Sequence, residues 1–135
     1  MPMTLKVRVP ERVVLDTEAA KVVAEGQEGG FGVLPRHIDY VAPLVPGLLA
    51  YTLVAESPED EAEEVFLAVD EGVLVKCGRD VLVSVRDAVV GGDLDALEAT
   101  VRDRFQERRA REEAMHAALA KLEAEVVRRF VELNE

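Results

Sequence analysis

The chain has 135 residues, enough for one domain whose core needs no disulfide or metal to stabilise it. It contains 27 acidic and 16 basic residues, a formal net charge of −11, which argues against nucleic acid or an anionic membrane surface as its main partner. One cysteine excludes a disulfide framework, two histidines leave little material for a metal cluster, and an aromatic content of 4% argues against a platform that stacks bases.

The N-terminal residues lack the continuous apolar stretch of a secretory signal, so we expect a cytoplasmic chain. The longest uncharged run, residues 40–55, is shorter than the ~20 residues that a membrane-spanning helix needs. Pro43 and Pro46 also interrupt this run, and proline breaks a helix. The sequence therefore predicts no membrane span within the chain.

In the first two thirds of the chain, apolar and polar residues alternate, which is the period of a half-buried β-strand. The clearest example places Leu5, Val7 and Val9 on one face, with charged residues between them. Further runs of this kind cover residues 12–15, 19–25, 31–34, 47–55, 64–69, 73–77 and 81–85. Glycine and proline separate the runs, so we expect residues 1–90 to form an antiparallel β-sandwich domain or a flattened barrel.

After Gly91 and Gly92 the apolar spacing changes to three and four residues, the period of an amphipathic helix. Asp93 is a suitable N-cap for this helical domain, which we place at residues 91–135. The apolar positions expected to pack are Leu94, Leu97, Val101, Phe105, Met115, Leu119, Leu122, Val126, Phe130 and Leu133. Polar residues interrupt this stripe at residues 108–113, where no glycine or proline breaks the backbone. The sequence therefore permits a two-helix hairpin that folds about this segment, or one long helix.

His37, Asp39 and Cys77 could in principle supply nucleophilic catalysis, which needs a thiol, a base and an orienting group in contact. Their spacing gives no sign that they meet. Cys77 also occupies an inward position of a predicted strand, where a free cysteine packs as a small hydrophobic residue. We therefore expect packing and surface roles for these residues, and no catalytic site.

Residues 56–64 contain six carboxylates, a composition that could hold a hard cation such as Ca²⁺. The run lacks the spacing and the turn glycine of an EF-hand, so we interpret it as a solvated hairpin loop. Residues 29–32 are rich in glycine, but no Lys-Ser/Thr pair follows them, and they lead into a strand rather than a helix. They are not a phosphate-binding loop, and the sequence indicates no metal site and no cofactor.

The segment 104–111 is basic within an acidic chain, with four arginines against one glutamate. One interpretation is a solvated helix face that carries Glu–Arg pairs four residues apart. The other is a docking surface for an acidic partner, because arginine pairs bidentately with carboxylates. Without a catalytic constellation, the residues favour an interaction module over an enzyme.

Residues 26–49, which read GQEGGFGVLPRHIDYVAPLVPGLL, resemble the epsilon subunit of F-type ATP synthases, the subunit called delta in mitochondria. The positions that carry the similarity along the chain are residues 31–35, His37, Pro46, Gly47, 66–75 and 87–95. Gly30, Arg36 and Glu71 depart from the usual pattern of the family. These departures resemble a divergent branch, the N-type ATPases of bacteria and archaea.

The resemblance implies a non-catalytic subunit of the rotor stalk, which couples the catalytic head of a rotary ATP synthase to its ion-translocating c-ring. In that family the sandwich binds the gamma subunit and rests on the c-ring. The helical part either folds against the sandwich or extends along gamma towards the alpha and beta subunits and blocks ATP hydrolysis. Such a chain is peripheral to the inner (plasma) membrane and reaches it only through the complex. The family's ATP-binding motif has no counterpart after Leu94 and Asp95, so we expect no ATP site.

The resemblance also implies roles for individual residues. The residues expected to contact the c-ring are Glu28, Gly29, Gly30, Phe31, Leu34, Pro35, Arg36 and His37. The residues expected to contact the beta subunit and to regulate it are Arg104, Arg108, Arg109 and Arg111. An alternative of a different class is a free-standing β-sandwich scaffold that dimerises through the apolar stripe of residues 115–133.

Overall fold

The computed structural model describes residues 2–57, 59 and 61–133. The chain divides into two compact units, Met1–Phe105 and Gln106–Glu135. The first unit holds all the described strands and a short helical segment, and the second is helical. None of the helices in the described part of the chain combines the length and apolarity that a membrane crossing requires.

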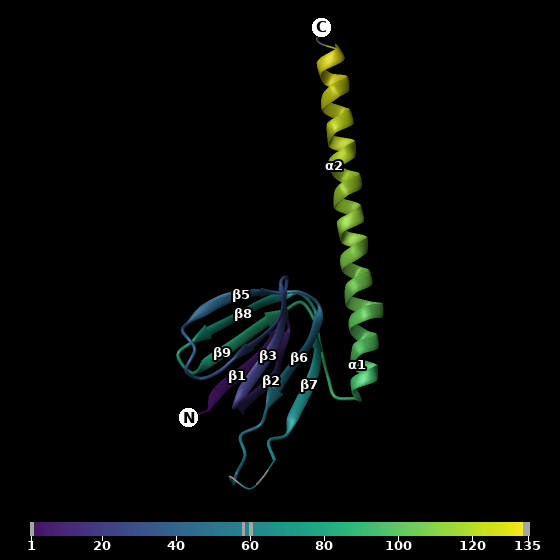
Figure 1. The fold of residues 1–135 in the computed structure, drawn as a ribbon. Helices are drawn as coiled ribbons and strands as arrows, with labels where there is room; N and C mark the ends of the chain where they lie inside the picture. Colours follow the sequence, from purple (N-terminus) through teal and green to yellow (C-terminus); the bar gives the residue numbers. More distant parts are fainter. Residues whose placement is uncertain (1, 58, 60, 134–135) are drawn as a thin grey trace. The chain divides into compact units, whose positions relative to one another are not determined.

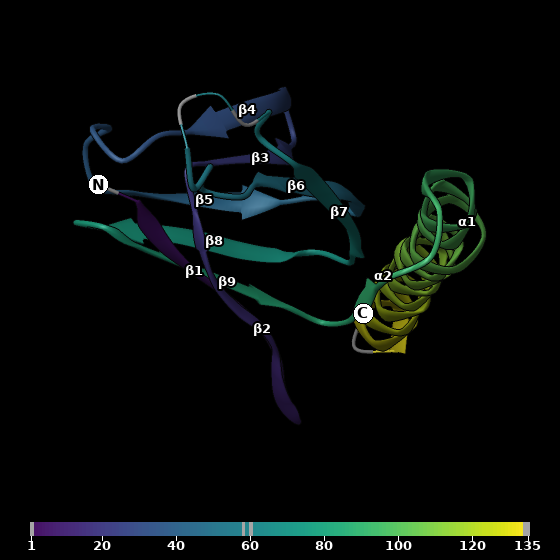
Figure 2. The ribbon, with the colours of Figure 1, turned by 90° about the horizontal axis from the view of Figure 1, so that it is seen from below.

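Two five-stranded sheets pack face to face in the first unit, and Figure 2 shows the two layers. Across the first sheet lie β2 (Arg12–Ala19), β1 (Met3–Val9), β9 (Asp80–Val85), β8 (Gly72–Cys77) and β5 (Tyr40–Leu44). Across the second lie β10 (Ala88–Val90), β7 (Glu64–Val69), β6 (Gly47–Thr52), β3 (Lys21–Gly26) and β4 (Gly29–Val33). Neighbouring strands are antiparallel except β1 and β9, which run parallel. The predicted β-sandwich is confirmed, with one parallel pair that alternation did not indicate.

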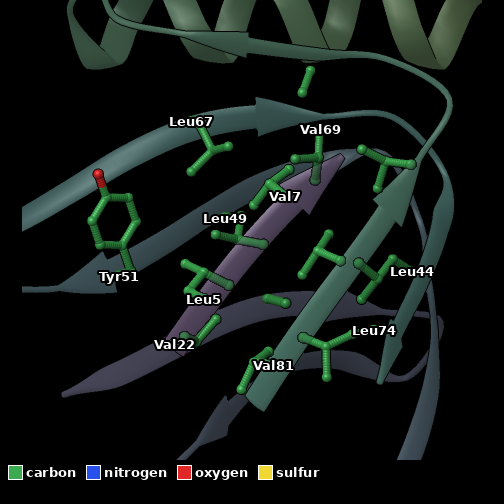
Figure 3. Packing of buried hydrophobic residues seen from close by; sticks show 14 of the residues in the cluster. Leu5, Val7, Val22, Leu44, Leu49, Tyr51, Leu67, Val69, Leu74 and Val81 are labelled. Carbon is green, nitrogen blue, oxygen red and sulfur yellow. The ribbon is translucent and has the colours of Figure 1, made fainter. Parts of the chain in front are cut away.

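The core lies between the sheets and follows from the alternation of apolar and polar residues. β1 alternates buried and exposed side chains along its whole length. Figure 3 shows the side chains that meet between the layers, among them Leu5, Val7 and Val81 from the first sheet and Val22, Leu49 and Leu67 from the second. Each fully buried Val or Leu contributes about 1.5–3 kcal/mol relative to an exposed position.

The strand pattern differs from the expectation in several places: β2 continues to Ala19, and β10 was not expected. The run 19–25 is not one strand, because the chain passes from the first sheet to the second at Ala20. The backbone N–H of Ala20 donates to the carbonyl oxygen of Thr52 at 2.8 Å, which ties this corner to β6. Alternation also missed β5, because Pro43 interrupts the pattern. Proline is accommodated there because β5 lies at the edge of its sheet.

The helical part begins where the sequence predicts. α1 (Leu94–Thr100) starts at Asp93, whose carboxylate accepts a hydrogen bond from a first-turn backbone N–H at 2.7 Å. A π-helical segment, Val101–Gln106, follows α1. Val101 and Phe105, which are four residues apart in this segment, both pack in the cluster against the sandwich.

α1 and the π segment cover the outer face of the second sheet, and Figures 1 and 2 show α1 beside β7. Leu97, Val101 and Phe105 form an apolar cluster with Leu48, Phe66, Ala68 and Val89. Leu94, which the helical spacing placed in the same stripe, is instead 42% exposed. The first compact unit therefore extends past residue 90 to Phe105.

α2 (Glu107–Leu133) is one helix of 27 residues in which no side chain is buried. It runs through residues 108–113 without a turn, and Figure 1 draws it as a single helix. Of the two alternatives that the sequence permits, the structure has the unbroken helix and not a hairpin about this segment. The apolar side chains exposed on α2 are Met115, Leu119, Leu122, Val126, Val127, Phe130, Val131 and Leu133.

Candidate functional site

The residues expected to contact the c-ring lie in two groups at opposite ends of β4. Glu28, Gly29 and Gly30 lie at the tip of the β3–β4 hairpin, where Gly26 pairs with Gly29. The turn 34–37 follows the other end of β4. At about 3.3 Å per residue, a strand of this length separates the two groups by roughly 15–20 Å. A partner that contacts both groups must therefore span the length of β4, and the contact with a c-ring stays a prediction.

The hairpin tip is rich in glycine, and Gly29 and Gly30 are exposed. Gly29 has a φ of +119°, a conformation that other residues rarely adopt, and a Cβ there would meet nothing within 4 Å. Phe31 does not protrude from the tip, because its ring packs against Gly26 and lies edge-on to Tyr40, with centroids 6.5 Å apart. Phe31 is therefore a half-buried packing residue, whereas Glu28 is exposed.

The turn 34–37 presents Arg36 at its tip. Pro35 occupies the second position, where its fixed φ suits a turn. The His37 N–H donates to the carbonyl oxygen of Leu34 at 3.1 Å, and the Leu34 N–H donates to Nδ1 of His37 at 3.3 Å. The imidazole of His37 thus helps to close the turn that displays Arg36.

Lys76 is buried at the end of β8, which the sequence did not indicate. Its side chain is 2% exposed, and the expectation that Cys77 points inward is wrong because Cys77 is exposed. By residue type alone, cysteine is expected to be buried and lysine to be exposed. In a strand, however, alternate side chains share a face, so Lys76 lies on the same buried face as Leu74, and Cys77 lies on the other face. The thiol of Cys77 is exposed, the Asp39 carboxylate accepts the N–H of Gly78, and Nδ1 of His37 accepts the N–H of Leu34.

A buried ammonium group needs hydrogen-bond partners, and Lys76 finds them in the backbone. Its Nζ donates to the carbonyl oxygens of His37 at 2.6 Å and Gly78 at 2.8 Å. Oδ1 of Asp39 accepts a hydrogen bond from the N–H of Gly78 at 2.7 Å. Gly78 has a φ of +60° and is the first residue of the two-residue turn between β8 and β9. These bonds fasten the turn 34–37 to the tip of the β8–β9 hairpin.

The two outer faces of the sandwich differ. α1 and the π segment cover the second sheet, whereas no described segment of the first unit covers the first sheet where β5, β8 and β9 run side by side. Strand register puts Val41 opposite Val75, and Val75 opposite Leu82, on the outward side. Val73 shares this side, and Val41 is 66% exposed. These four residues form the apolar outer face, and contiguous exposed apolar surface marks an interaction site.

The basic stretch divides between the two units. Arg104 belongs to the first unit, where its guanidinium pairs with the carboxylate of Asp87 at 2.8 Å. In α2, Arg109 pairs with Glu113 at 3.2 Å, four residues further along the helix. Arg111 is exposed. The stretch therefore includes an intrahelical pair of the kind that a solvated face predicts, and its contact with a beta subunit stays a prediction.

The acidic run lies in the loop between β6 and β7, and its residues Pro58 and Asp60 lie outside the described residues. Among residues 2–57, 59 and 61–133, no three His, Cys, Asp or Glu side chains are grouped so that they could hold a metal ion.

Burial raises the pKa of the Tyr40 phenol. Burial, and to a smaller degree the charge of Glu63, raises the pKa of Tyr51. Both tyrosines pack in the core cluster, Tyr51 as a buried residue and Tyr40 as a partly buried one.

Comparison with families of known proteins gives a match over most of the chain. The family described as "ATP synthase, Delta/Epsilon chain, beta-sandwich domain" matches residues 2–91. ATP synthase epsilon chain 2 of Cereibacter sphaeroides is 39% identical over 104 residues, which cover 76% of this chain and 67% of the relative. The ATP synthase epsilon chain of Moorella thermoacetica is 33% identical over 132 residues, which cover 98% of this chain and 94% of the relative.

Solved structures give the same fold at lower identity. A chain in the OSCP/F1/c-ring assembly of the Euglena gracilis mitochondrial ATP synthase has a TM-score of 0.60 and 20% identity, over 81% of this chain and 64% of that chain. A chain in the central stalk/c-ring of the Tetrahymena thermophila mitochondrial ATP synthase has a TM-score of 0.54 and 14% identity, over 84% and 96%. The first of these matches therefore spans less than two thirds of its chain, and both show the fold alone.

Proposed function

Because the chain belongs to the family of ATP synthase delta/epsilon chains, we propose that it is the epsilon subunit in the central stalk of an ATP synthase. In this role it is a non-catalytic rotor part, peripheral to the membrane, that couples the catalytic head to the ion-translocating c-ring. The Moorella relative supports this role, because the similarity covers 98% of the chain and so includes α2 as well as the sandwich.

The observation that carries the proposal is the apolar surface that the chain leaves exposed. The apolar outer face lies open on the first sheet, and the stripe of residues 115–133 lies open on α2. A helix is stabilised mainly by packing its apolar face, so the exposed apolar side chains of α2 are suited to contact with a partner. A subunit held between several partners in a stalk would bury both surfaces.

We assign the apolar outer face to the gamma subunit. Val41 and Val73 lie on adjacent strands, β5 and β8, so together they offer a flat apolar area for a partner helix. We then assign the c-ring contact to one or both ends of β4. The hairpin tip at Gly29 lets another backbone approach closely, and the turn 34–37 offers the guanidinium of Arg36.

We assign α2 to regulation of ATP hydrolysis at the catalytic head. Its apolar stripe would lie along gamma, and its arginines would meet acidic side chains of the beta subunit. Replacing Arg108 and Arg109 by glutamate should then relieve inhibition of hydrolysis in the assembled complex. Lys121→Glu, which also reverses a charge on α2, is the matched control and should leave inhibition unchanged. If the wild-type chain and all variants inhibit ATP hydrolysis equally, α2 has no regulatory role of this kind.

Co-expression with the gamma subunit of the same organism tests the assignment to the stalk. The full chain should co-purify with gamma at equal stoichiometry. Val41→Glu should abolish this, because it puts a charge on the apolar outer face without disturbing the core. Val54→Glu, at an exposed valine outside the strands, is the control and should retain gamma.

The same preparation separates the rotor role from the alternative. A free-standing scaffold would be a dimer by light scattering and would not bind gamma. It would become monomeric when Leu119 and Leu122 are replaced by lysine. A monomer that binds gamma supports the stalk. A stable dimer that does not bind gamma contradicts it.

A further inference from the structure

We propose that a hollow between two turns of the sandwich is a binding site for a phosphate group. Its lining residues are Leu34, Pro35, Arg36, His37 and Arg79. Arg36 lies at the tip of the turn 34–37. Arg79 is the second residue of the turn that joins β8 to β9, and neither the motifs nor the resemblance gave it a role.

The hollow concentrates positive charge that the chain does not neutralise. Arg36 and Arg79 are exposed, and neither forms an ion pair with any residue that the structure describes. Other arginines of this acidic chain do pair, among them Arg86 with Glu71. Two guanidinium groups at one hollow repel each other, and an anion between them replaces that repulsion with attraction.

Lys76 adds a third positive charge to the same region. Its Nζ is bonded to two carbonyl oxygens and to no carboxylate in the described chain. The acidic residues nearest in sequence are Asp39 and Asp80. The Asp39 carboxylate already accepts the N–H of Gly78, and Asp80 is exposed at the start of β9. Arg36, Arg79, Lys76, Asp39 and Asp80 together carry a formal charge of about +1, in a protein whose net charge is −11.

The two turns are held in place before any ligand arrives. Lys76 and Asp39 both bond to Gly78, and Lys76 also bonds to the carbonyl oxygen of His37. On the opposite side, the N–H of Thr4 donates to the carbonyl oxygen of Arg79 at 2.8 Å. The backbones that carry both guanidinium groups are therefore fixed, and a prearranged site loses little entropy on binding.

Arginine pairs favour phosphate because each planar guanidinium donates two parallel N–H bonds to its oxygens. The phosphate could come from an anionic lipid headgroup or from solution. Leu34 is 41% exposed, and Ile38, one residue after the turn, is 82% exposed. Apolar side chains beside arginines fit the boundary between headgroups and acyl chains. Phosphate binding itself does not rest on the proposed function, because it is measured on the free chain.

Titration of the ¹⁵N-labelled full chain with inorganic phosphate, followed by amide chemical shifts, tests the site. Saturable shifts should be confined to residues 34–38 and 78–80. Arg36→Gln and Arg79→Gln should each weaken the apparent affinity about tenfold or more, the loss expected for one charge-assisted contact. Arg12→Gln removes the same charge from β2 at the far edge of the sheet, so it is the matched control and should leave the affinity unchanged.

Two further experiments test whether the site prefers phosphate to another anion and whether the phosphate belongs to a lipid headgroup or is free in solution. Acetate at equal ionic strength should bind at least tenfold more weakly, and equal affinity would overturn the assignment to phosphate. Co-sedimentation with phosphatidylglycerol vesicles, absent with phosphatidylcholine and lost in Arg79→Gln, would assign the phosphate to a lipid headgroup. Phosphate binding without co-sedimentation would assign it to a free anion. Shifts that do not saturate, or that Arg36→Gln and Arg79→Gln leave unchanged, would overturn the proposal.

Discussion

Replacing Phe105 by alanine should separate the helical segment from the sandwich. The side chain is 0% exposed and lies in the cluster on the outer face of the second sheet. A fully buried phenylalanine replaced by alanine costs about 3–5 kcal/mol, because apolar contact is lost and a cavity remains. The Arg104 guanidinium, 5.7 Å from the ring and paired with Asp87, adds at most about 1 kcal/mol because the pair is largely solvated. Packing of the ring, and not the ion pair, therefore holds this segment.

Hydrogen exchange and urea unfolding together measure this effect. In Phe105→Ala, the amides of residues 94–106 should lose protection while the strands of the core keep theirs. The Arg104→Ala variant should change protection of that segment by less than tenfold. Phe130→Ala is the matched control, since Phe130 is 66% exposed on α2, and it should change stability by less than about 0.5 kcal/mol. Unchanged protection of residues 94–106 in Phe105→Ala would refute the packing argument.

Three further predictions concern the stability of the first unit. A chain that ends after Phe105 should unfold in urea like the sandwich of the full chain, whereas one that ends after Val90 should be at least about 3 kcal/mol less stable, because it uncovers the outer face of the second sheet. Lys76→Met should cost about 2 kcal/mol, since two carbonyls lose a charged donor, and equal urea midpoints would contradict this. The raised pKa of Tyr51 stabilises the fold below its ordinary value of 10.0, and this contribution is lost as pH rises through the folded-state pKa. Tyr51→Phe should therefore flatten the fall of Tm that begins near pH 10.0, measured by calorimetry, and an unaltered slope would count against this prediction.

Alternation predicted most of the strands because the face on which a side chain lies is a local property. Leu5, Val7 and Val9 are buried as their spacing indicates. The parallel pairing of β1 with β9 depends on segments more than 70 residues apart in the chain, and no local pattern records it. The corner at Ala20 was missed for the same reason, because the run 19–25 reads as one strand until its partners in two different sheets are known.

The candidate site was less predictable than the fold. The family resemblance selected residues 28–31 and 34–37 for the c-ring contact, which stays a prediction, and it gave no sign that β4 would lie between the two groups. Arg79 and Lys76 could not be predicted as site residues, because their significance comes from the turn 34–37, which lies some 40 residues earlier in the chain and beside them in space. Composition also ranks lysine as a surface residue, and only the register of β8 turns Lys76 inward.

The continuity of the helical region could be foreseen only in part. Residues 108–113 contain good helix formers, so both a helix and a hairpin were compatible with them. The structure has helix there, and Leu97, Val101 and Phe105 are buried while the stripe of residues 115–133 is not. Spacing predicts which residues share a face of a helix, but it does not say which part of that face is buried.

Ion pumping per ATP hydrolysed, measured in vesicles that contain the ATP synthase assembled with and without this chain, tests the central claim most directly. The chain as epsilon subunit predicts that its omission leaves ATP hydrolysis but lowers the pumping ratio severalfold, and that adding back the full chain restores the ratio. Val41→Glu should fail to restore it, whereas Val54→Glu should succeed. An unchanged pumping ratio in a complex that assembles without this chain would contradict the account.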